Sequence, residues 1–210
     1  MLTVSTRRKA ARKRHRYHHG DLSRALVEAA LHTIQREGVE AVTLRGVGKD
    51  VGVSRTALYR HFADKSALLR AVAREGFRML RVALVASWEN AGKGRPGFDA
   101  MGQAYVRFAV ENPSHYRVMF GAAILGSAVD PELEQEGRAA FQSLVDALLE
   151  QQSEGIMVPD HPLQLALYIW SVVHGVAMLA IDGRFAHTNL EIGALTRYIL
   201  ERSRTGIMRN

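Results

Sequence analysis

The sequence predicts an all-α fold, in which a long helix joins an N-terminal helix-turn-helix domain of three helices to a larger helical domain. Apolar residues recur every three or four positions through most of the 210 residues, the spacing that buries one face of a helix. Prolines stand where several of these apolar runs begin, which suits the first turn of a helix. No segment with the period of a strand competes with these helices, so we expect no β-sheet.

The first domain is predicted over residues 21–69. An apolar residue at every fourth position from Leu22 to Ile34 forms the buried stripe of its first helix. We expect Asp21 to be the N-cap of this helix and Gly38 to end it.

Three further helices are predicted from capping residues. In chain order they are 44–51 after Thr43, 55–62 after Ser54, and a long helix after Asp64 that continues past Leu84. Gly52 supplies the turn between the first two of these helices. Gly46 and Gly48 lie inside a helix, at a cost of about 1 kcal/mol each relative to alanine, so we expect packing to hold that helix and some local mobility to remain.

The second domain, residues 70–210, is predicted to contain more helices, namely 98–111, 114–120, 131–153, 163–181 and 190–204. Residues 92–97 match the G-x-G-x-x-G pattern of dinucleotide sites. The pattern follows a helix instead of a strand, however, and it contains Pro96. We therefore interpret it as a loop between helices.

The first 20 residues hold the whole net charge of the chain. They contain seven Lys or Arg and no Asp or Glu, whereas the rest contains 21 basic and 21 acidic side chains. Such a segment cannot bury enough apolar surface to order itself, so residues 1–20 are predicted to be a flexible basic arm. Three roles are open for this arm. It is only a solvated charge run, it is attracted to cell surfaces or membranes, or it contacts nucleic-acid phosphates. We favour phosphates, with Arg12, Lys13, Arg14 and Arg16 as the candidate contacts.

The composition limits the chemistry of the chain. Without cysteine there is no disulfide, thiol catalysis or thiolate metal site. The sequence has no G-x-S-x-G elbow, no H-E-x-x-H pair and no P-loop, and the histidines of the arm offer no fixed metal geometry. We therefore expect no catalytic residues, no metal and no cofactor. With no export signal or membrane span visible, the expected location is the cytoplasm.

Four motifs follow one another in the first domain. They are Val42-Thr43-Leu44-Arg45, Val51-Gly52-Val53-Ser54, Ala57-Leu58-Tyr59-Arg60-His61-Phe62 and Lys65-Ser66-Ala67-Leu68-Leu69. Through them the chain resembles the tetracycline-repressor (TetR) family of transcriptional regulators. The resemblance implies that double-stranded DNA is a partner and that the third helix enters the major groove by its N-terminal end.

In this arrangement Arg55, Thr56 and Arg60 are the side chains best placed to reach base edges or flanking phosphates, and Arg55 is the first candidate for guanine. By resemblance to the family, the phosphate contacts are Thr43, Arg45, Tyr59, His61 and Lys65. Ser54 and Ala57 complete the predicted DNA-binding set. Phosphate contacts position the domain and carry little sequence information.

The second domain extends the resemblance through two segments, Asn112 to Gly121 and Trp170-Ser171-Val172-Val173-His174-Gly175. Similar tryptophan-histidine-glycine (WHG) segments mark one group of TetR-like ligand-binding domains. The helix 163–181 is apolar nearly all round, which requires burial on more than one face. With the helix 190–204 it could form half of a four-helix bundle across a two-fold axis, so a homodimer is expected.

His174 is the only Asp, Glu, Lys, Arg or His between Gln164 and Asp182, so it must be hydrogen-bonded, paired or facing a cavity. One interpretation is a structural histidine. The other is a small-molecule pocket, with these candidate lining residues: Tyr105, Tyr116, Met119, Phe120, Trp170, His174 and Met178. Aromatic and Met side chains around one or two polar groups suit a mostly apolar ligand.

The function predicted from these features is a sequence-specific transcriptional regulator, a repressor released from a palindromic operator by a small apolar ligand. One alternative is a DNA-binding protein without a small-molecule effector, either controlled by a protein or acting as a sequence-tolerant chromosomal binder. A more remote alternative is an enzyme acting on the pocket ligand.

Overall fold

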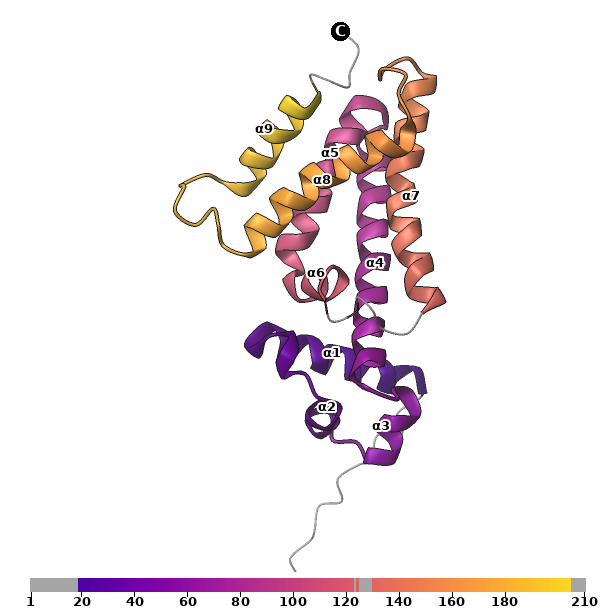
Figure 1. Ribbon diagram of the computed structural model, residues 1–210, viewed down its shortest axis with the longest axis vertical. Coiled ribbons are helices and arrows are strands. Elements are labelled where there is room, and N and C mark those ends of the chain that lie inside the picture. Colours follow the sequence, from indigo (N-terminus) through magenta and orange to yellow (C-terminus); the bar gives the residue numbers. More distant parts are fainter. Residues whose placement is uncertain (1–18, 123, 125–129, 205–210) are drawn as a thin grey trace, which may run out of the picture.

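The computed structural model describes residues 19–122, 124 and 130–204, and over these residues the chain is built of helices (Figure 1). They are α1 (His19–Glu37), α2 (Leu44–Val51), α3 (Arg55–His61), α4 (Lys65–Asn90), α5 (Gly94–Glu111), α6 (Pro113–Met119), α7 (Pro131–Ser153), α8 (Pro162–Ile181) and α9 (Ile192–Arg204), with a single 3-10 turn, Val39–Ala41. The expected all-α fold is confirmed. The arm residues Arg12, Lys13, Arg14 and Arg16 lie outside the described part.

Side-chain caps start α2, α3 and α4, as predicted. Thr43, Ser54 and Asp64 each accept a hydrogen bond from the backbone N–H three residues further on, at 3.0, 3.2 and 2.7 Å. Each cap satisfies one of the N–H groups that a helix leaves unpaired at its start. The order of caps therefore fixes where each of the three helices begins.

The N-cap expected at Asp21 is wrong. The first helix already begins at His19, which places Asp21 within its first turn. The expected stop is confirmed, because α1 ends at Glu37 and Gly38 has a φ of 87°. That angle is in the left-handed region where only glycine is comfortable.

Close packing explains why a glycine occupies position 48 inside α2. A Cβ atom on it would lie 3.0 Å from Cδ2 of Leu58, so the missing side chain lets α2 approach α3 closely. Gly52 then has a φ of 75° in the turn between the two helices. The motif is thus held by packing and turn geometry at positions where helix propensity is poor.

The helix α4 runs through both parts of the molecule (Figure 1). Its first turns contribute Leu68, Leu69 and Val72 to the core shared with α1, and its later turns pack against α5, α6 and α7. The predicted boundary between residues 69 and 70 therefore falls inside one continuous helix, and the division into domains remains a prediction.

The ion pairs between α4 and α7 add polar contacts to this packing. Arg70 Nε lies 3.3 Å from Asp130, Arg81 Nε lies 3.5 Å from Glu136, and Arg74 pairs with Glu132 between them. These pairs follow one edge of α4 toward the N-terminal domain.

The loop expected at residues 92–97 is shorter than predicted, because α5 already begins at Gly94 after Lys93 with a φ of 61°. Gly97 lies inside the helix, where a Cβ atom would come within 2.9 Å of the backbone oxygen of Trp88. This glycine therefore serves close packing of α5 on the end of α4, and no strand precedes the pattern in the described chain.

The helices α8 and α9 lie on the outside of the C-terminal bundle (Figure 1). Both carry large apolar side chains that remain exposed, namely Leu163, Leu167, Tyr168, Leu179 and Tyr198, and Leu190 is exposed just before α9. α8 is also the one described helix long and apolar enough to cross a membrane by length and composition, a test that core helices of soluble proteins pass as well.

Candidate functional site

The outer face of α3 presents a compact set of exposed polar side chains. Arg55, Thr56, Tyr59 and Arg60 are exposed, whereas Leu58 points into the core. The guanidinium carbon of Arg55 lies 5.5 Å from the centre of the Tyr59 ring. At this distance the ring attracts the cation and limits the positions that the Arg55 side chain adopts.

The start of α2 and the start of α4 flank this face. Thr43 and Arg45 are exposed at the start of α2, and His61 is partly exposed at the end of α3. At the start of α4, the amine of Lys65 donates a hydrogen bond of 3.0 Å to the backbone oxygen of Glu40. The structure thus brings the predicted residues of all three helices to one end of the domain.

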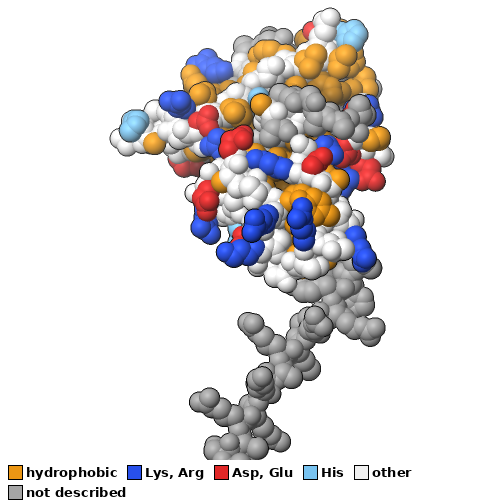
Figure 2. All heavy atoms as spheres, turned by 60° about the horizontal axis from the view of Figure 1, so that its bottom comes forward, with side chains coloured by type: hydrophobic (Ala, Val, Ile, Leu, Met, Phe, Trp, Pro, Cys, Tyr) orange, Lys and Arg blue, Asp and Glu red, His pale blue; other side chains and the backbone are white. Residues whose placement is uncertain are grey.

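The charge of this end is positive. Residues 43–65 contain five Lys or Arg and two Asp. Figure 2 shows Lys and Arg side chains gathered over the end of the molecule formed by the N-terminal helices. Together with the N-termini of α2 and α3, this surface is suited to bind a polyanion.

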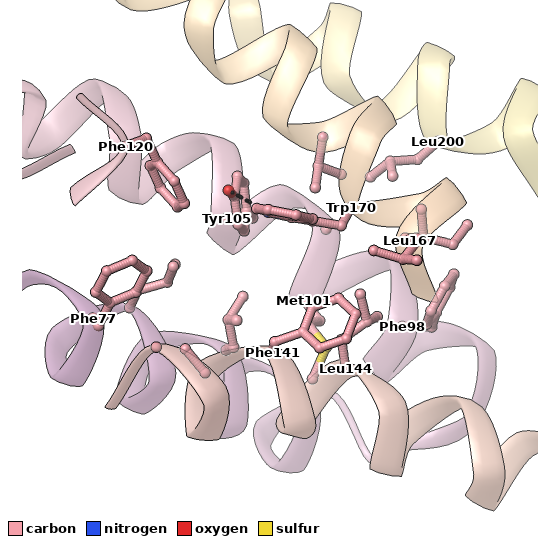
Figure 3. A pocket seen from close by; sticks show the side chains of 17 residues that line it. Phe77, Phe98, Met101, Tyr105, Phe120, Phe141, Leu144, Leu167, Trp170 and Leu200 are labelled. Carbon is pink, nitrogen blue, oxygen red and sulfur yellow. Dashed lines mark hydrogen bonds between the residues drawn. The ribbon is translucent and has the colours of Figure 1, made fainter. Parts of the chain in front are cut away.

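A cavity of about 300 Å³ lies in the second part of the chain, among α4, α5, α7 and α8 (Figure 3). Its wall is apolar and aromatic, and it consists of Phe77, Leu80, Leu84, Phe98, Met101, Gly102, Tyr105, Phe120, Gly137, Ala140, Phe141, Leu144, Leu167, Ile169, Trp170, Val173 and Leu200. Such a wall favours an apolar ligand.

A chain of polar side chains lies behind one wall of the cavity. The indole N–H of Trp170 donates to the hydroxyl of Tyr105 at 2.9 Å, and the hydroxyl of Tyr116 donates to the same oxygen at 3.0 Å. Nδ1 of His174 lies 2.7 Å from the Tyr116 hydroxyl and 3.1 Å from that of Tyr105. The four side chains therefore satisfy one another.

Burial keeps this cluster uncharged near neutral pH. It raises the pKa of Tyr105 to about 12 and raises the pKa of Tyr116 well above its usual range. It lowers the pKa of His174, because the charged imidazolium loses hydration. The cluster thus offers dipoles and no net charge to the cavity beside it.

Three of the seven side chains predicted to line a pocket, Tyr105, Phe120 and Trp170, do line the cavity. Tyr116 and His174 lie behind the wall in the hydrogen-bonded cluster. The other two lie elsewhere, since Met119 fills the space over Gly76, and Met178 is partly buried against the core without lining the cavity.

The contributions of α4 and α7 to the cavity could not be predicted from the sequence. Phe77, Leu80 and Leu84 of α4 line the cavity, as do Phe141 and Leu144 of α7. Their spacing is that of any buried helix face, so periodicity carries no signal that separates a cavity wall from a filled core.

Another buried histidine lies closer to the N-terminal domain. His115 of α6 packs against Gly76 of α4, and its Nε2 atom is buried without a hydrogen-bond partner. Burial lowers its pKa, and the nearby carboxylate of Glu75 opposes this shift. Among the described residues, no three His, Asp or Glu side chains group closely enough to hold a metal ion.

Two family models match the chain. One describes bacterial regulatory proteins of the tetR family and matches residues 26–72, and the other describes a tetracyclin repressor-like C-terminal domain and matches residues 98–202. The chain therefore belongs to the TetR family and is a DNA-binding transcriptional regulator. Members of this family are not enzymes, and they typically dimerise.

Individual relatives agree with this placement. An uncharacterized HTH-type transcriptional regulator of Mycobacterium tuberculosis is 29% identical over 164 residues, covering 76% of this chain and 70% of the relative. A protein of unknown function from Rhodococcus sp. RHA1 has a TM-score of 0.82 at 30% identity, covering 92% of this chain and 99% of that one. A TetR family transcription regulator from Marinobacter aquaeolei shares the fold, with a TM-score of 0.67 at 20% identity over 90% of this chain and 96% of that one.

Proposed function

We propose that the chain is a cytoplasmic repressor that binds a palindromic operator as a homodimer and leaves it when a small apolar molecule fills the cavity. One observation carries this proposal. The same helix, α4, lines the cavity with Phe77, Leu80 and Leu84 and packs into the N-terminal core with Leu68 and Leu69. A change in the cavity therefore acts on the element that positions α3.

In the proposed complex, the N-terminal end of α3 enters the major groove. Arg55 reads a guanine through its two-pronged guanidinium, and Thr56 and Arg60 reach neighbouring bases or phosphates. Ser54 caps the helix and stands with Ala57 at the same end, where unpaired N–H groups attract a phosphate. The exposed positions of Arg55, Thr56 and Arg60 support these roles.

Phosphate contacts from the flanking elements hold α3 in register. Thr43 and Arg45 contact the backbone from α2, and Tyr59 and His61 do so from α3. Lys65 exchanges the carbonyl of Glu40 for a phosphate when DNA is present. The positive charge of residues 43–65 supports this set, which would make affinity depend on salt.

The homodimer forms through the exposed apolar side chains of α8 and α9. Leu163, Tyr168, Leu179 and Tyr198 stay exposed in the single chain, and a second copy would cover them in a four-helix bundle. A two-fold axis through that bundle carries two copies of α3, which read half-sites ~34 Å apart.

Coupling between the two sites acts through α4. Its 26 residues extend over about 39 Å, so a small tilt at the cavity moves the N-terminal domain as a lever. A coupling of about 1–3 kcal/mol would change operator affinity by roughly 5- to 150-fold.

The test is to measure operator affinity with and without saturating ligand, using an operator selected from random duplexes. We expect the ligand to weaken operator binding, and the operator to weaken ligand binding by the same factor, because linkage is reciprocal. If ligands bind without changing operator affinity, the protein regulates DNA without a small-molecule effector. Similar affinity for operator and scrambled duplex would indicate a sequence-tolerant binder, and turnover of the ligand would indicate an enzyme.

A further inference from the structure

We infer that the cavity takes an uncharged aromatic molecule of about two fused rings, held by apolar contact and ring edges and not through a polar group. The inference rests on the proposed function, in which the cavity is the effector site, and it names the chemical class of the effector. Charge, hydrogen bonding and shape each support it separately.

The wall of the cavity carries no charge. Among its residues there is no Asp, Glu, Lys, Arg or His. Arg81 and Glu136, on two of the lining helices, pair with each other, and neither lines the cavity. A carboxylate or ammonium group entering this space would lose its hydration and find no partner, which is strongly unfavourable.

The polar atoms of the wall are already satisfied. The Trp170 N–H donates to the Tyr105 hydroxyl, which also accepts from Tyr116 and lies within hydrogen-bond distance of His174 Nδ1. A phenol oxygen has one proton and two lone pairs. In the tautomer whose Nδ1 carries no proton, His174 accepts the Tyr105 proton, and the other two contacts fill the lone pairs. A polar substituent on the ligand therefore gains no hydrogen bond unless this cluster comes apart.

The rings of the wall meet edge to face. Phe77 and Phe120 have centroids 5.4 Å apart at 80°, and Phe141 and Trp170 have centroids 5.8 Å apart at 68°. Aromatic pairs favour this geometry, and a flat ring between these walls would extend it (Figure 3). A cavity of about 300 Å³ is twice the roughly 150 Å³ space that holds one benzene, which indicates about two rings.

The experiment is calorimetric titration of the full chain, without DNA, with naphthalene, 2-naphthol and 2-naphthoate at neutral pH. We expect 2-naphthol to bind roughly 10-fold more weakly than naphthalene, because its hydroxyl loses hydration and gains no hydrogen bond. We expect 2-naphthoate to bind at least 100-fold more weakly. A carboxylic acid with a pKa near that of a glutamate, about 4.3, is neutral in only about one molecule in 500 at pH 7.

Gly137 offers a matched pair of variants that places the binding in the cavity. Gly137 lines the cavity, and a Cβ atom on it would lie 3.9 Å from the Phe77 ring, an ordinary contact. Gly137→Ala should keep naphthalene binding within a few-fold, and Gly137→Leu should fill the space and abolish it. Ala140→Met is a second filling variant, and thermal unfolding of each variant confirms that it folds.

The inference is overturned if 2-naphthoate binds as well as naphthalene, if naphthalene does not bind, or if both filling variants still bind it. Because the titration contains no DNA, it reports on the ligand class alone. Operator release, measured separately, decides the proposed function.

Discussion

The two ends of α4 serve surfaces of opposite construction. Its N-terminal end supports an exposed, positively charged face made from the contiguous residues 43–65, where each helix starts at its own side-chain cap. Its later turns line an apolar, uncharged cavity whose wall is drawn from residues between Phe77 and Leu200. The first surface depends on local structure, and the second depends on how distant helices pack.

This difference predicts that the two surfaces can be changed independently, with α4 as their connection. Substitutions on α3 should alter DNA binding and leave the cavity intact. Substitutions in the cavity should alter ligand binding and leave α3 in place.

The largest effect is expected from a substitution in the proposed dimer interface of α8 and α9. Tyr168→Glu puts a charge into the proposed bundle, so the dimer should dissociate and operator affinity should fall by about 100-fold or more as the two half-sites lose their linkage. Sedimentation and operator titration measure the two effects. Leu149→Glu on α7 is the control, since Leu149 is 45% exposed and Tyr168 is 47% exposed. A Tyr168→Glu variant that stays dimeric would show that the interface lies elsewhere.

The next largest effect is expected on the preference of the protein for a particular DNA sequence. Arg55→Ala should weaken operator binding by about 1–3 kcal/mol, roughly 5- to 150-fold, and relax the preference at one base pair. Ligand affinity, measured by calorimetry, should not change. Arg78→Ala removes an exposed positive charge from α4 away from this face and serves as the control. If both variants lose operator affinity equally, Arg55 contributes only its positive charge.

Substituting alanine for each of two glycines in the second domain should change the free energy of unfolding in opposite directions. Gly97→Ala should lower the free energy of unfolding by about 1–3 kcal/mol, because its Cβ would press on the backbone oxygen of Trp88, which cannot move aside. Gly137→Ala should raise it by up to about 1 kcal/mol, because its Cβ has room and alanine favours the helix. Urea unfolding of both variants checks this, and a stabilised Gly97→Ala would contradict the packing of α5 on α4.

The smallest effect is expected on the stability of the protein as the pH is lowered. Burial lowers the folded-state pKa values of His115 and His174, so the unfolded chain binds protons more readily than the folded chain. Their contribution to stability is therefore complete above about pH 6.5, the unfolded value, and is lost as pH falls from there toward the folded pKa. Urea midpoints measured above and below that pH should differ less in His115→Gln than in the parent. His32→Gln, at an exposed histidine of α1, is the control. If the pH dependence of the urea midpoint changes equally in both variants, His115 has no special role in it.

The sequence predicted where the three helices of the first surface begin, since caps and turns are local. Thr43, Ser54 and Asp64 start their helices as expected, and Gly52 turns the chain between α2 and α3. The start of α1 was misplaced because aspartate is favoured both as an N-cap and inside the first turn of a helix, and α1 begins at His19. The DNA-contact roles themselves remain predictions.

The cavity was less predictable for a physical reason. Tyr105, Phe120 and Trp170 were singled out as aromatic residues near a lone histidine, and they line it. The side chains of α4 and α7 show the same periodicity whether they face a filled core or a void. His174 could be identified as needing a partner, but its partner Tyr116 is 58 residues away in the sequence.

The most direct test of the central claim is selection of bound sequences from a random duplex library at near-physiological salt. Affinities for the enriched sequence and a scrambled control then follow. We predict a two-fold symmetric sequence with half-sites about one turn apart, bound at least 10³-fold more tightly than the control. If no sequence is enriched, or if an enriched sequence lacks two-fold symmetry, then a pair of α3 helices reading a palindrome is not how this protein recognises DNA.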